Sequence, residues 1–248
     1  MSERDDSLRP LALALVASVL LWQVPFGAYL LYPFKLFGTW LHEGSHAIAM
    51  LGTGAGFARM QIFRDGSGLA LALRPSGPTA GAFIAAAGYM GAPLWGAAIL
   101  AIARDERGAR RVLVALGLLL GATALASIAN YFGQVALGVT GVGFLLLAAI
   151  PRPRWHLALA HLVAAQACIG ALVDIRVLYR PNLVVDGKVV RDSDAHSMAL
   201  ASFGTDANWA VWLWASIWLA WSLGILFFAL WRVRQRMNRV SGSLLSGR

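Results

Sequence analysis

Charged residues are scarce in this chain, at 13% of its 248 residues, whereas hydrophobic residues make up 58% and the mean hydropathy is +0.64. An ordinary soluble domain carries roughly 25% charged residues. So little charge excludes a typical soluble protein. It predicts an integral membrane protein instead.

Cysteine is almost absent, because Cys168 is the only one. A single cysteine can form no internal disulfide, and its apolar surroundings favour a small core residue. We also find no internal repeat, coiled-coil heptad, P-loop or glycine-rich dinucleotide motif. The sequence therefore gives no indication of a nucleotide-binding or disulfide-stabilised class of protein.

Acidic residues are outnumbered, with 12 Asp and Glu against 21 Lys and Arg, so the net charge is +9. In a soluble protein this excess would suggest nucleic acid. Here the arginines cluster between apolar runs, as loops on anionic lipid do. We therefore expect the lipid bilayer as a partner and no nucleic acid.

Long apolar runs dominate the chain and predict an all-α polytopic membrane protein with about seven transmembrane helices and one or two short β-hairpins. A polar segment covers 1–10, a single transmembrane domain 11–231 and a basic tail 232–248. The predicted spans are 11–34, 35–52, 79–103, 111–128, 132–150, 155–178 and 209–231. The arginines of the tail favour a cytoplasmic C-terminus.

Two short segments have the pattern of β-hairpins. In the first, ARMQIF, RDGSG and LALALR read as strand, turn and strand, and VVDGKVV carries an Asp-Gly turn. The first hairpin could be an ordinary surface loop. Alternatively, it could pair with an extended substrate by strand addition.

One stretch organises the chain, LFGTWLHEGSHAIAMLG at 36–52, because it places three ionisable side chains in an apolar run. On a helix, His42 and His46 lie on one face and can both bind one metal ion, with Glu43 beside them. This H-E-x-x-H arrangement is typical of zinc hydrolases, in which the glutamate activates a zinc-bound water. The spacing therefore predicts a Zn²⁺ site with Glu43 as the catalytic base.

A chance match or a vestigial polar patch is the competing interpretation of these three residues. With only five His and three Glu in the chain, a chance match has a probability of roughly one in a thousand. Charged groups inside a bilayer also cost about 2.5 to 3.5 kcal/mol each. Three such groups on one helical turn therefore indicate a joint use.

A zinc site of this kind needs a third protein ligand, and Asp174 is our first candidate. Its carboxylate lies in an apolar span and needs a neutralising cation. Arg176 and Arg180 stand at spacings that do not bring them onto its face of a helix. Asp194, and then His161 or His196, are the remaining candidates.

The order of several motifs resembles the M50B-like membrane metallopeptidases, relatives of the site-2 proteases. HEGSHAIA, a hairpin, AGYMG, VDIRVLY and SDAHSMA follow one another over about 36–215. The resemblance implies zinc held by both histidines of the motif and by an aspartate from a later transmembrane helix. His42, Glu43 and His46 match directly, whereas Asp174 matches by position and lacks the usual Asn-Pro-Asp-Gly or Leu-Asp-Gly setting.

These observations favour a zinc-dependent intramembrane endopeptidase that cuts membrane-spanning protein substrates, located in the plasma (inner) membrane of a bacterium. A non-catalytic membrane scaffold, or a pseudo-protease that keeps a structural metal site, is the alternative. A transporter is less favoured because few acids lie within the spans and no inverted repeat is visible.

Overall fold

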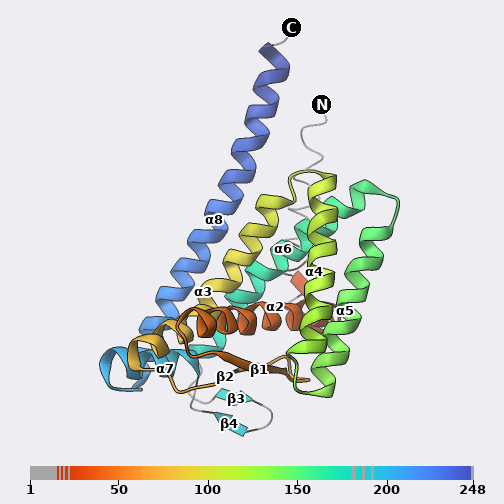
Figure 1. The fold of residues 1–248 in the computed structure, drawn as a ribbon. Helices are drawn as coiled ribbons and strands as arrows, with labels where there is room; N and C mark the ends of the chain where they lie inside the picture. The colour runs from red at the N-terminus through yellow and green to blue at the C-terminus, as the bar shows by residue number, and fades with distance from the viewer. Residues whose placement is uncertain are drawn as a thin grey trace.

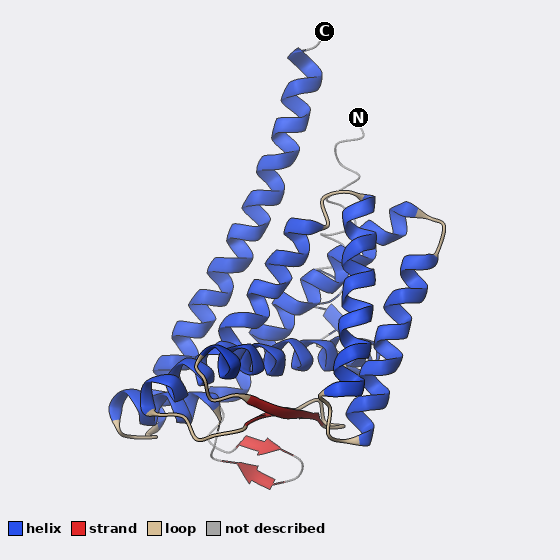
Figure 2. Ribbon diagram, viewed as in Figure 1, coloured by secondary structure: helices blue, strands red, loops and turns tan. Residues whose placement is uncertain are grey.

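The computed structural model describes residues 16, 18, 20–21, 23–179, 183–185, 188–190 and 193–246. Within these residues the chain is mostly helical, with two small hairpins (Figures 1 and 2). The longer elements are α2 (Pro25–Gly52), α3 (Pro78–Ile102), α4 (Glu106–Ala126), α5 (Tyr131–Ala149), α6 (Pro153–Ile175) and α8 (Asn208–Ser246). The shorter ones are β1 (Phe57–Ile62), β2 (Gly68–Ala72), the 3₁₀ helix η1 (Arg176–Tyr179), β3 (Leu183–Val185), β4 (Lys188–Val190) and α7 (Asp194–Phe203).

In the part of the chain that the structure describes, five helical segments are long and apolar enough to cross a membrane. They are α3, α4, α5, the segment Trp155–Tyr179 and the segment Asn208–Arg232 of α8. These agree closely with the last five predicted spans. Three of the helices, α2, α3 and α6, begin with a proline at the first helical positions, where its missing N–H costs nothing.

The first two predicted spans need correction. Helix α2 begins at Pro25, so residues 25–34 belong to it and no break separates 34 from 35. Most of 11–24 lies outside the described residues. In addition, α2 is not among the five candidate spans. It runs across the bundle, crosswise to α4 and α5 (Figure 1). Lys35, at the junction of the first two predicted spans, lies within α2 and is helical.

Within the predicted basic tail, α8 continues as one helix to Ser246. The strand pairs of both predicted hairpins are present: β1 pairs antiparallel with β2, and β3 with β4. The predicted Asp-Gly turn at 186–187 lies outside the described residues. Ser193 caps α7 as an N-cap residue does, by accepting a hydrogen bond from the backbone N–H of His196.

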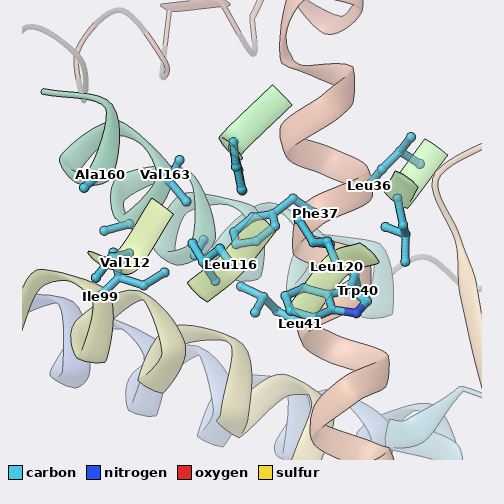
Figure 3. Close-up of a cluster of buried hydrophobic side chains, with 14 of the residues drawn as sticks. Leu36, Phe37, Trp40, Leu41, Ile99, Val112, Leu116, Leu120, Ala160 and Val163 are labelled. Atoms are coloured by element: carbon cyan, nitrogen blue, oxygen red, sulfur yellow. The ribbon is translucent and has the colours of Figure 1, made fainter. Parts of the chain in front are cut away.

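The main core lies where α2 crosses the bundle. Phe37, Trp40 and Leu41 of α2 pack against α3, α4, α5 and α6, and Leu116 and Leu120 of α4 complete the contact (Figure 3). A second core joins α3 and η1 to α7 and α8, with Trp218 fully buried at its centre. The two cores hold α2 and α7 against α3. They thereby set the geometry of the site.

Candidate metal centre

The motif histidines lie side by side on α2, as the i, i+4 spacing predicts. Their ring centroids are 4.7 Å apart, and the Nε2 atoms are 3.0 Å apart. His46 and Glu43 are buried, with 5% and 6% of their surface exposed. Two imidazole nitrogens therefore point at the same small volume, inside the protein and beside a carboxylate.

Asp194, at the first turn of α7, completes this group. Its Oδ2 lies 3.0 Å from His42 Nε2 and 3.2 Å from His46 Nε2. Ligands at 2.0–2.1 Å from a tetrahedral Zn²⁺ would stand about 3.3 Å from one another, so the observed triangle is close to the size that the ion requires. Among the described residues, these three side chains form the group able to hold a metal.

The protonation of His46 fits a cation at this point. His46 Nδ1 lies 2.7 Å from the backbone carbonyl of Ile84, and a carbonyl can only accept. Nδ1 therefore carries the proton of the neutral ring, and Nε2 presents a lone pair to its neighbours. Metal-binding histidines are oriented by such a bond from the second nitrogen.

The charge of Asp194 also fits a cation site. Burial alone would raise the pKa of its carboxyl group, but the adjacent His46 and His42 outweigh burial and hold that pKa below its ordinary value. Asp194 is thus ionised under ordinary conditions. Its negative charge favours a cation between the two imidazoles.

Asp174, our first candidate for the third ligand, is not part of the group. It lies at the next-to-last position of α6, within electrostatic reach of His42 and Lys35. Asp194, our second candidate, stands beside the two histidines instead. The burial argument identified a carboxylate that needs a cation, but it could not show that α7 folds back against α3 and α8.

The two other candidate histidines are engaged elsewhere. His161 Nε2 bonds to the carbonyl of Ala103 at the end of α3, at 3.2 Å. His196 Nδ1 bonds to the hydroxyl of Ser193 at 2.8 Å. Neither side chain joins the group around His42.

Helix α3 explains the AGYMG segment of the sequence. A Cβ atom added at Gly88 would clash with Nε2 of both motif histidines, and one added at Gly91 would clash with Ser45. Only glycine lets α3 lie this close to α2. Tyr89, which follows Gly88, places its ring centroid 4.6 Å from that of His42. Sequence analysis gave no role to Tyr89 or to the Ile84 carbonyl.

The first hairpin is fixed to α2 by its turn. Three side chains on one face of α2 donate hydrogen bonds to successive carbonyl groups of the turn: Tyr32 to Arg64 (2.6 Å), Lys35 to Asp65 and Thr39 to Gly66 (2.6 Å). We call these three side chains the latch. Their spacing of three and four residues places them along one helical stripe that continues to Glu43.

This attachment places β2 directly against Glu43. A Cβ atom added at Gly68 would stand 2.6 Å from Cγ of Glu43, and the backbone amide of Ala70 faces the Glu43 carboxylate. The hairpin therefore forms one wall of the site. A side chain at position 68 would displace either β2 or the glutamate.

The outer edge of β1 is closed by the connection between α4 and α5. Met60 exchanges backbone hydrogen bonds with Ser127 and Ala129, and the Asn130 side chain bonds both the N–H and the carbonyl of Ile62. The opposite edge of the hairpin belongs to β2, which faces the site. Asn130 thus acts as a hydrogen-bonding residue at the junction of α4 and α5.

Comparison with known protein families gives one match. The sequence profile of the family described as Peptidase M50B-like matches residues 11–229. The chain belongs to this family. No curated protein and no solved structure matches it significantly.

Membership in the M50B-like family supports the class of protein predicted from the sequence. Together with five apolar helices, it indicates an integral membrane protein of a metallopeptidase family. The His42, His46 and Asp194 group provides this M50B-like protein with a possible metal site.

Proposed function

We propose that this M50B-like protein is a zinc-dependent membrane endopeptidase in which His42, His46 and Asp194 hold Zn²⁺ and Glu43 is the catalytic base. One observation carries the proposal: three ligand atoms converge within 3.0–3.2 Å of one another, next to a buried glutamate of the same helix. When bound, Zn²⁺ supplies Lewis acidity that polarises the scissile carbonyl and makes water more acidic.

Glu43 performs the proton transfers in this proposal. Its carboxylate takes a proton from the attacking water and gives it to the amine of the leaving peptide. The walls around it, β2 on one side and α3 on the other, exclude bulk water and keep the carboxylate beside the metal ligands. Exclusion of water strengthens each electrostatic interaction within the site.

The substrate in this proposal is a protein segment that leaves the membrane at the end of the bundle where α7 and the hairpins lie (Figure 1). A helical peptide bond is hydrogen-bonded and shielded, so the segment must unwind before it is cut. The unwound backbone would add to β2, because the outer edge of β1 is already paired. We place the protein in the plasma (inner) membrane of a bacterium.

A cleavage assay with metal analysis tests this function. The purified chain in detergent is expected to contain one zinc ion per molecule and to cut a co-expressed single-span membrane protein. In Glu43→Gln, zinc is retained and cleavage falls by about 100-fold or more, because the amide cannot accept the proton. Stoichiometric zinc, with no cleavage by either protein, would favour the scaffold. Loss of zinc in Glu43→Gln would make Glu43 a ligand.

A further inference from the structure

The two metal-site histidines are held in different ways. His46 is oriented by the hydrogen bond from Nδ1 to the Ile84 carbonyl. The described part of the chain offers His42 Nδ1 no such partner, and only its Nε2 forms polar contacts there. A metal-binding imidazole normally has its second nitrogen bonded, so the orientation of His42 needs another cause.

Two stacked aromatic rings next to His42 account for its orientation. The Tyr89 ring of α3 meets the His42 ring nearly at right angles, at 83° and 4.6 Å between centroids. On the other side, Tyr89 stacks on Trp218 of α8 at 5.0 Å and 12°. With His46 at 4.7 Å and 73°, the His42 ring has aromatic neighbours in two directions.

The burial of Trp218 indicates that its ring surface matters more than its polar atom. The side chain is 0% exposed, and its Nε1 has no hydrogen-bond partner among the described residues. A buried, unbonded N–H lowers stability. The indole is therefore best explained at this position by its flat surface, which supports Tyr89 across the contact between α3 and α8.

We propose that Tyr89 and Trp218 are positioning residues that hold the His42 imidazole in its metal-binding orientation. Rotation about χ2 of a histidine is weakly restricted on its own, so an unbonded ring needs packing on its faces to stay in place. Tyr89 provides that packing, and Trp218 keeps Tyr89 from turning away. This inference rests on the proposed function in taking His42 as a zinc ligand.

Zinc affinity, measured on the full chain in detergent by competition with a chelator, tests this inference. We expect Tyr89→Leu and Trp218→Leu to bind Zn²⁺ about 10- to 100-fold more weakly, the range found when outer-shell support of a ligand is lost. Tyr89→Phe and Trp218→Phe keep a flat ring and should bind zinc as the parent does. Trp212→Leu is the matched control, since Trp212 is on the same helix but 42% exposed and outside the stack.

The outcomes separate this inference from the proposed function. Parent-like affinity in both leucine variants would overturn this inference alone, and so would an equal loss of affinity in the phenylalanine variants. A parent protein that binds no zinc would overturn both. If a leucine variant does not fold, as judged by gel filtration, Tyr89→Met and Trp218→Met replace the ring with an adaptable apolar chain and decide the question in the same assay.

Discussion

At the scale of single residues, the third metal ligand could not be chosen from burial alone, because the choice depends on the distances between side chains. Asp174 and Asp194 are both carboxylates within electrostatic reach of His42. Only Asp194 brings an oxygen within 3.2 Å of both Nε2 atoms. The cost of a carboxylate in an apolar span shows that it needs compensation, but several groups can provide it.

Substitution of the two aspartates is therefore expected to give different results. Asp194→Ala removes one of three protein ligands and should abolish stoichiometric zinc binding, whereas Asp174→Ala should retain zinc. The measurement is zinc content after gel filtration of each variant in the detergent used for the parent. Retained zinc in Asp194→Ala together with its loss in Asp174→Ala would restore Asp174 as the ligand.

At the scale of elements, the close approach of α3 to α2 requires a residue without a side chain at Gly88. In Gly88→Ala the new Cβ would overlap both Nε2 atoms, so either the helices separate or the imidazoles turn. We expect zinc affinity to fall by about 10-fold or more, since the ligands lose their orientation. Gly121→Ala is the control, because a Cβ added there meets nothing within 4 Å. Equal zinc affinity in the two variants would contradict this account.

The latch gives a second prediction at this scale. In Thr39→Val the hydrogen bond to the Gly66 carbonyl is lost, and β2 can shift relative to Glu43. Because a displacement of about 1 Å can cost 100-fold in rate, kcat per zinc-loaded molecule should fall by roughly 10- to 100-fold while zinc content stays at the parent level.

Two further variants show whether the fall in kcat comes from a shift of β2 relative to Glu43 or from a general loss of stability. Thr39→Ser keeps the hydroxyl and should restore kcat. Thr123→Val removes a similar side-chain bond, to Leu119 within the exposed part of α4, and should leave kcat unchanged. A drop in thermal stability in Thr39→Val, with kcat per zinc-loaded molecule unchanged, would limit Thr39 to a structural role.

Local sequence patterns predicted most elements of this fold but not their mutual arrangement. Apolar length gave α3 and α5 to within one residue at each end, α6 to within a few residues, and the existence of α4 and α8, although α4 begins five residues earlier and α8 continues to Ser246. Strand and turn patterns gave both strand pairs. The motif spacing gave His42, Glu43 and His46. The roles of Tyr89 and Asp194 could not be predicted in this way, because they depend on contacts between helices far apart in the chain.

At the scale of the whole molecule, the crosswise course of α2 changes how the chain meets the membrane. Seven spans would place Lys35 on the same side as Arg104, since both would follow an odd number of crossings. In the structure, Lys35 bonds to Asp65 in the turn of the first hairpin. The hairpin and Arg104 lie at opposite ends of α3, which is itself a candidate span (Figure 1).

Labelling of single cysteines distinguishes the two arrangements. The chain suits this method because its only cysteine, Cys168, is buried at 1% exposure and can be replaced by alanine for a clean background. In intact cells, a membrane-impermeant maleimide should react with Lys35→Cys from the side that labels Arg64→Cys, and not from the side that labels Arg104→Cys. Full labelling of all three after detergent treatment shows that each thiol is reactive. Labelling of Lys35→Cys together with Arg104→Cys would mean that a loop divides α2 and that the first two predicted spans exist. The sequence alone does not distinguish the two arrangements, because a charged residue flanked by apolar runs can lie in a loop or can be a bonded side chain at the membrane surface.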